Sequence, residues 1–100
     1  MKFRLEVKEE ALQDIAEAMQ WYKPKAVNLD TKFLAAVEEG FNRILLNPFA
    51  FKKIYKSFRQ TGVRTFPYVI VYTQEKDTVI IISVFNTWQH PRKKLGRLKK

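Results

Sequence analysis

Residues 68–87 read YVIVYTQEKDTVIIISVFNT, and this stretch decides the fold class that the sequence predicts. Its two apolar segments, Tyr68–Tyr72 and Thr78–Thr87, are rich in the β-branched and aromatic residues that favour strands. The polar residues Gln74–Asp77 separate the segments, so we expect an antiparallel β-hairpin. Val79–Phe85 presents apolar residues on both faces, which is typical of a central strand covered on each side.

The N-terminal part of the chain predicts a strand followed by a helix. Lys2–Val7 alternates apolar with charged residues, which is the period of a half-exposed strand. From Glu9 the period becomes helical, and Pro24 ends the helix because proline disfavours helical backbone at the preceding residue. Asp14 and Glu17 fall on the polar side, where a solvated helix face explains them better than a catalytic carboxylate pair. The predicted apolar face consists of Leu12, Ile15, Ala16, Met19 and Tyr22.

A second amphipathic helix is expected to begin at Asn28 or Asp30, either of which can cap it, and to stop at Asn47-Pro48. Gly62–Phe66 is a further β-rich segment, and Pro67 should lie at a bend or on an edge because proline cannot donate to a ladder. The order β-α-α-β-β-β predicts an α+β fold, in which a helical hairpin packs on a mostly antiparallel sheet.

The composition excludes several classes of protein. A chain of 100 residues with 46% hydrophobic residues is expected to form one globular domain, residues 1–100. With no Cys and one His, the sequence excludes a disulfide scaffold and a thiol nucleophile, and we expect neither a metal site nor a cofactor. No apolar run approaches the ~18 residues of a membrane span, and no signal-peptide pattern is present, so we expect a cytoplasmic protein without a membrane partner.

Positive charge is concentrated in the second half of the chain. Nineteen Lys and Arg against ten Asp and Glu give a formal net charge of +9. Residues 1–50 carry seven Lys and Arg against eight acids, whereas residues 51–100 carry twelve against two. This asymmetry indicates an anionic partner, either nucleic acid or an acidic protein segment; a surface that only aids solubility is the alternative.

Two basic segments are candidates for binding. Residues 49–68 interleave aromatics with cations, which suits phosphates and unpaired bases, unless the rings are core and the cations face solvent. In this segment Arg59 and Arg64 are the strongest candidates, because strand positions hold a guanidinium rigidly. The tail, residues 92–100, has six cations and no acid, which suits a phosphate, an acidic peptide or a solvated terminus. His90 is expected in an exposed loop rather than as an acid–base catalyst.

Four groups of residues, taken in order, carry a resemblance to a known family. They are Ala11-x-x-Asp14-Ile15-x-x-Ala18-x-x-Trp21-Tyr22, Phe33-Leu34 with Ile44-x-x-Asn47-Pro48, Val63-Arg64-x-Phe66-Pro67-Tyr68-x-Ile70-x-Tyr72, and Ile82-Ser83-Val84-Phe85-Asn86-Thr87 with Pro91. Through them residues 3–94 resemble the RelE/ParE superfamily of toxins from bacterial type II toxin–antitoxin modules, closest to ParE-like members. The resemblance implies the fold expected above from periodicity.

The resemblance also implies a growth inhibitor that is neutralised by a cognate acidic antitoxin. RelE-type members cleave mRNA in the ribosome, whereas ParE-type members inhibit DNA gyrase. RelE-like nucleases usually carry Arg where this chain has Val69, and a later Arg where it has Thr87, Trp88 and Gln89. We therefore expect gyrase as the partner and target. A ribosome-dependent mRNA endonuclease and a toxin-derived binding module without toxicity are the alternatives.

Whether the protein is an enzyme stays open at this point, and the catalytic residues are unknown. In a nuclease, Tyr68 or Lys93 would assist proton transfer. For a binding protein, the sheet face and the tail should contact the target or the antitoxin, with Trp88 as an anchor at the centre. The candidate binding residues are Arg59, Arg64, Trp88, Arg92, Lys93 and Lys94.

Overall fold

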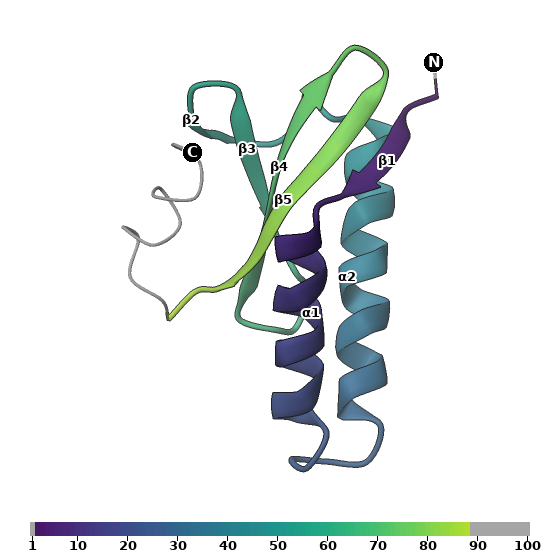
Figure 1. Cartoon of the computed structure of the whole chain (residues 1–100), viewed down its shortest axis with the longest axis vertical. Coiled ribbons are helices and arrows are strands. Elements are labelled where there is room, and N and C mark those ends of the chain that lie inside the picture. The colour runs from purple at the N-terminus through teal and green to yellow at the C-terminus, as the bar shows by residue number, and fades with distance from the viewer. Residues whose placement is uncertain (1, 89–100) are drawn as a thin grey trace.

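The computed structural model describes residues 2–88, which form a helical hairpin and a five-stranded sheet (Figure 1). The strand order is β1-β5-β4-β3-β2, with β1 parallel to β5 and all other neighbours antiparallel. This arrangement confirms the predicted α+β fold and adds one short strand, β2. The elements are β1 (Arg4–Val7), α1 (Glu9–Tyr22), α2 (Leu29–Leu46), β2 (Lys53–Tyr55), β3 (Phe58–Gly62), β4 (Tyr68–Glu75) and β5 (Thr78–Asn86).

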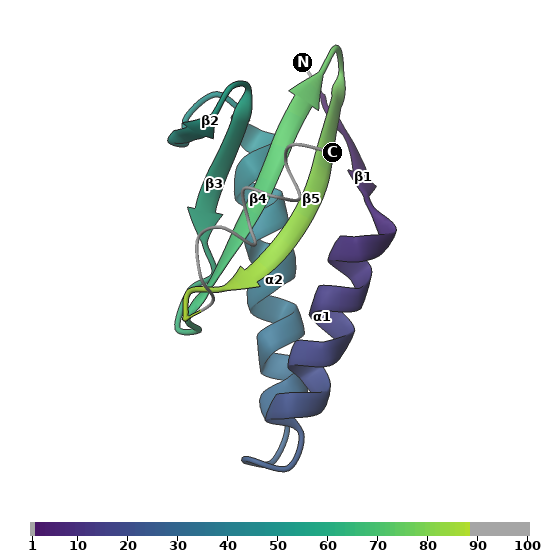
Figure 2. The same ribbon diagram turned by 60° about the vertical axis from the view of Figure 1, so that its left-hand side comes forward.

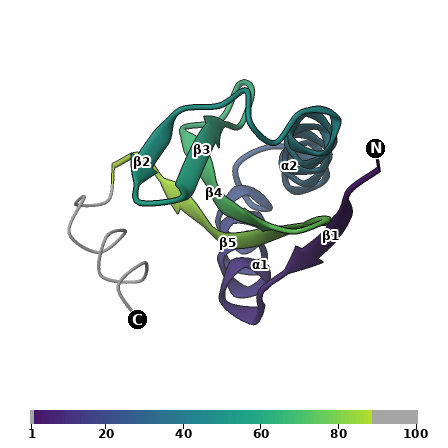
Figure 3. The same cartoon turned by 90° about the horizontal axis from the view of Figure 1, so that it is seen from above.

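The β4–β5 hairpin is the centre of the sheet, as predicted, and Figure 3 shows β1 and β2 at opposite ends. Its register shifts once, because Val71 pairs with Ser83 whereas the next residue, Tyr72, pairs with Ile81. Ile82 is therefore an extra residue in β5, which makes a β-bulge. Because of this extra residue, the alternation of residues that face the helices differs between the part of β5 before the bulge and the part after it.

The main core lies between the helices and the sheet, and Figure 2 shows β4 and β5 passing in front of α2. Small residues set the distances in this core. On α1, the predicted apolar face is confirmed at Ile15, Met19 and Tyr22, which belong to the core. It was wrong at Leu12, which is 54% exposed, and at Ala16; Ala11 and Ala18 are buried instead. On α2, Gly40 leaves room for the side chain of Ile70, whose Cδ1 lies 2.5 Å from where a Cβ would stand. Because these alanines and this glycine have small side chains or none, the two helices can lie close to the residues packed against them in the core.

The segment before β4 differs from the prediction. The strand expected at residues 62–66 was wrong, because β3 ends at Gly62 and a turn follows it. The Val63 N–H donates to the Tyr68 carbonyl at 2.9 Å, and Thr65 has a φ of 68°, which a strand does not allow. Pro67 lies in this bend, as predicted.

The helix boundaries confirm where the helices were predicted to end, but the predicted side-chain cap of α2 was wrong, because the Asn28 side chain makes no capping hydrogen bond. α1 ends at Tyr22, shortly before Pro24, and α2 ends at Leu46, immediately before Asn47-Pro48. Asn28 is the residue before α2, and its backbone carbonyl accepts a hydrogen bond from the Thr31 hydroxyl at 2.9 Å. Neither helix within residues 2–88 is long and apolar enough to cross a membrane.

Candidate functional site

The predicted binding residues that the structure describes lie at two ends of the sheet. Arg59 is near the start of β3, whereas Arg64 follows the end of that strand. Trp88 is at the same end as Arg64, because the N–H of Thr87 donates to the Pro67 carbonyl at 2.7 Å, in the turn that contains Arg64. Arg59 is therefore not brought together with the other two. Of the remaining predicted residues, Arg92, Lys93 and Lys94 lie outside the described residues.

Arg59 supports the loop before β2. Its Nη1 donates hydrogen bonds to the carbonyls of Phe51 at 2.8 Å and of Phe49 at 3.3 Å. The guanidinium also lies 5.8 Å from the centroid of the Phe49 ring, within cation–π range. Arg59 therefore has a structural role that the sequence did not indicate.

Tyr72 holds the start of the same loop from the core side. Its buried hydroxyl donates to the Pro48 carbonyl at 2.6 Å. Burial raises the pKa of Tyr72 to about 12, although the nearby Arg59 guanidinium acts to lower it. A buried phenol with this pKa is a structural donor and is unsuited to proton transfer near neutral pH.

We expect Tyr72→Phe to lower the free energy of unfolding by about 1–2 kcal/mol, because the buried Pro48 carbonyl loses its partner. The folded pKa of Tyr72, about 12, lies above the unfolded value near 10. The neutral hydroxyl thus contributes its full stability below the unfolded pKa, and this is lost as pH rises through the folded pKa. Urea unfolding at neutral and alkaline pH should show a smaller alkaline loss for the variant. Tyr55→Phe, at a half-buried position, is the matched control and should change little.

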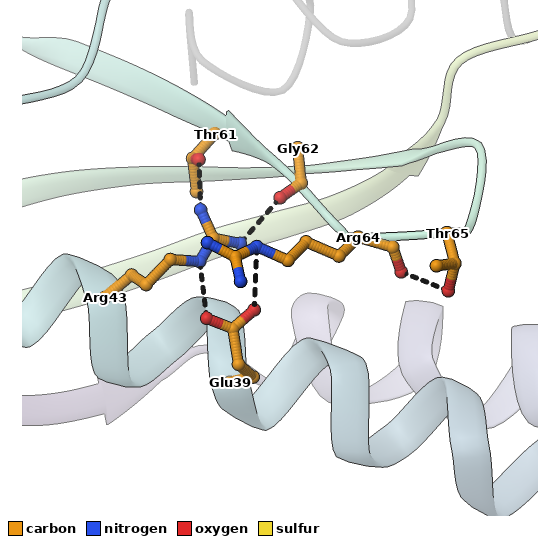
Figure 4. A network of polar contacts seen from close by, with 6 residues as sticks. All are labelled: Glu39, Arg43, Thr61, Gly62, Arg64 and Thr65. Atoms are coloured by element: carbon orange, nitrogen blue, oxygen red, sulfur yellow. Dashed lines mark hydrogen bonds and ion pairs between the residues drawn. The ribbon is translucent and has the colours of Figure 1, made fainter.

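Arg43 and Glu39 clamp α2 to β3 (Figure 4). Arg43 Nε lies 2.7 Å from Glu39 Oε2, and its two Nη atoms donate to Thr61 Oγ1 at 3.0 Å and to the Gly62 carbonyl at 2.9 Å. Arg64 Nε approaches the other carboxylate oxygen, Oε1, at 3.6 Å, and its side chain is 71% exposed. Arg64 is thus loosely ion-paired and remains accessible to an anionic partner. Arg43 is not among the residues predicted from the sequence, although its i, i+4 spacing from Glu39 is a usable signal.

A hollow of about 400 Å³ lies between α1 and the adjoining ends of β4 and β5. Trp21 and Trp88, which are 61% and 84% exposed, are the two tryptophans of the chain, and both line it. Asp14 and Glu17 supply two carboxylates to the same hollow. The complete lining is Asp14, Glu17, Ala18, Trp21, Tyr68, Val84, Asn86 and Trp88.

The placement of Asp14 corrects its assignment to a solvated helix face. Its carboxylate Oδ2 accepts the backbone N–H of Val84 at 3.0 Å. The pairing of β1 with β5 ends at Val7 and Ile81, so a side chain takes over where the strand partner stops. Asp14 therefore has a structural role at the edge of β5.

Aromatic rings lie behind the hollow. Tyr68, which lines it, packs against Phe33 at 4.8 Å and against Tyr22 at 6.2 Å between ring centroids. Burial raises the pKa of the Tyr22 hydroxyl, and the neighbouring Tyr68 raises it further. On the strand side, the Asn86 side-chain oxygen accepts the Trp88 N–H at 2.7 Å and fixes the backbone there. The hollow thus has buried aromatic rings on its core side and exposed indoles on its solvent side.

The arrangement offers several ways to bind a partner. It combines exposed indoles, two carboxylates and the accessible guanidinium of Arg64 at one end of the sheet. Within residues 2–88, no group of three or more His, Cys, Asp or Glu side chains could hold a metal ion.

Comparison with known proteins identifies the family. The model of the family described as "ParE toxin of type II toxin-antitoxin system, parDE" matches residues 5–91. The chain belongs to the ParE toxin family. The match covers nearly all of the described elements, and it confirms the resemblance that the sequence motifs carried.

Two solved structures share the fold of this ParE-family chain. A chain of the chromosomal ParDE TA system from P. aeruginosa has a TM-score of 0.65 at 14% identity, covering 85% of this chain and 96% of that one. A mutant of the E. coli toxin RelE in the free state has a TM-score of 0.64 at 18% identity, covering 94% of this chain and 93% of that one. A comparison with curated proteins finds no match.

Proposed function

We propose that this chain is the toxin of a type II module, that a cognate acidic antitoxin neutralises it, and that it acts by inhibiting DNA gyrase. The observation that carries the proposal is the match to the ParE family model over residues 5–91. An antitoxin partner is supported by the ParDE system from P. aeruginosa, which has the same fold. The net charge of +9 favours an acidic partner.

The described side chains support binding more than catalysis. Arg59 is occupied by loop carbonyls, and the Tyr72 hydroxyl is buried against Pro48. Val69, which stands where RelE-like nucleases usually carry Arg, packs in a small apolar cluster with Val71 and Phe85. These positions thus contribute to the fold, and the exposed groups at the Arg64 end are left for contact with a partner.

Plasmid supercoiling by purified gyrase tests the proposed target. We expect the folded chain to inhibit supercoiling at saturating concentration. Because a protein of charge +9 also coats DNA, relaxation of the same plasmid by topoisomerase I is the control and should continue unchanged. Equal inhibition of both enzymes, or of neither, would contradict gyrase as the target.

Ribosome-dependent mRNA cleavage is the second candidate, favoured by the shared fold with RelE. Primer extension on cellular mRNA after induction distinguishes the two functions, since a nuclease leaves codon-positioned cuts and a gyrase inhibitor leaves none. Induction without growth arrest would instead indicate a toxin-derived binding module.

A further inference from the structure

The hollow is acidic and aromatic, although the whole chain is strongly basic. Asp14, Glu17 and Trp21 lie at positions i, i+3 and i+7, so they share one face of α1. Trp88 lines the hollow from the end of β5. Carboxylates beside exposed indoles repel the phosphates of a nucleic acid and attract a cation. The charge at this place is thus opposite to the net charge of the protein.

Trp21, which lines the hollow, already contacts a cation within the molecule, on Lys25, a residue outside the lining. Lys25 Nζ lies 4.0 Å from the centroid of the Trp21 ring, which is the geometry of a cation–π contact. An arginine side chain can contact both the indoles and the carboxylates of the hollow, which a lysine side chain does less well. Its planar guanidinium stacks on an indole and donates hydrogen bonds to carboxylates at the same time.

We propose that the hollow binds one arginine side chain, presented by an otherwise acidic protein segment. The segment should be acidic because a basic one would be repelled by a chain of charge +9 and by Arg64 at the same end of the sheet. The exposed indoles of Trp21 and Trp88 suit a protein partner, since tryptophan is enriched among the residues that dominate such interfaces. We identify this acidic segment as part of the antitoxin, and that identification rests on the proposed function.

The site is partly ordered before any partner arrives. The hydrogen bond from Val84 fixes the Asp14 carboxylate, and the bond from Trp88 to Asn86 fixes the backbone on the other side. Groups that are already fixed by hydrogen bonds lose little conformational entropy when the arginine side chain binds. Glu17 is exposed on the surface of α1, so its charge can be removed with little effect on the fold.

Tryptophan fluorescence tests the inference directly, because both tryptophans of the chain line the hollow. We expect N-acetyl-arginine amide to change the emission of the full chain in a saturable way. The citrulline analogue, which has the same shape without the charge, should not. Glu17→Gln should weaken the arginine response by about tenfold, the loss of one charge-assisted contact. Glu38→Gln removes an exposed acid on α2 that does not line the hollow. It is the matched control, and its arginine response should stay within about twofold of the unaltered chain.

An acidic peptide with one central arginine extends the test to a protein segment, and it should bind several-fold tighter than the same peptide with citrulline. Equal responses to arginine and citrulline would overturn the proposal, as would equal weakening by both glutamate variants. An emission shift caused by added salt alone, without a response to the arginine probe, would assign the hollow to a basic segment of this chain and also overturn it. These measurements use neither gyrase nor mRNA, so their failure is distinguishable from failure of the proposed target.

Discussion

Replacing Phe33 with alanine is expected to lower the free energy of unfolding by about 3–5 kcal/mol. Phe33 is fully buried in α2, and its ring lies 5.5 Å from Tyr22, 5.2 Å from Phe66 and 4.8 Å from Tyr68 between centroids. Truncation removes the apolar area of a whole ring and leaves a cavity that three rigid neighbours cannot fill. It also removes the edge-on contacts with Phe66 and Tyr68, which add to the effect of burial.

Urea unfolding followed by circular dichroism measures this effect. Leu46→Ala is the matched control, because Leu46 lies on the same helix and is 86% exposed; its truncation should change stability by less than about 0.5 kcal/mol. A loss below about 1 kcal/mol for Phe33→Ala would show that the ring cluster is not the centre of the core. Because Tyr68 packs on Phe33 and lines the hollow, the arginine response should also fall in this variant.

The elements that the sequence predicted well are those with strong local signals. Pro24 and Pro48 follow closely on the ends of both helices. Asn47, before Pro48, has left the helical backbone, whereas Lys23, before Pro24, is still helical, so Pro24 acts because it has no N–H to continue the helical hydrogen bonds. The β4–β5 hairpin follows from two apolar segments separated by a polar turn. In each case neighbouring residues decide the structure, and no distant contact is needed to choose between alternatives.

The errors arise where distant contacts decide. On α1, two apolar stripes compete, and the structure buries Ala11 and Ala18 rather than Leu12 because small side chains let the helix approach its neighbours. Residues 62–66 have strand-forming composition, but the left-handed backbone of Thr65 places them in a turn. Helical periodicity and β-propensity cannot distinguish these outcomes.

The hollow could not be predicted, because it joins segments far apart in the chain. Asp14 and Val84, which meet in a hydrogen bond, are 70 residues apart. The sequence predicts Trp88 as a binding anchor among cations, whereas the structure leaves it exposed beside carboxylates. Residue type also selected Arg59 for binding without revealing its hydrogen bonds to the loop carbonyls.

Arg43→Met is expected to lower the free energy of unfolding by about 2–3 kcal/mol. The substitution keeps an apolar stem of similar length but leaves Glu39 Oε2, Thr61 Oγ1 and the Gly62 carbonyl without the guanidinium. The expected loss is below that of a fully buried pair, because the Arg43 and Glu39 side chains are 21% and 40% exposed and water partly replaces the lost contacts.

A double-mutant cycle with Glu39→Gln isolates the ion pair, and it should give a coupling of about 1 kcal/mol or more, as for groups in one hydrogen-bonded network. Arg64→Ala is the matched control: its Nε lies 3.6 Å from Glu39 and its side chain is 71% exposed, so it should cost less than about 1 kcal/mol. If Arg64→Ala is as costly as Arg43→Met, then Arg64 is a structural residue like Arg59. If Arg43→Met alone is costly, Arg43 provides the clamp between α2 and β3, and the guanidinium of Arg64 is left to contact an acidic partner.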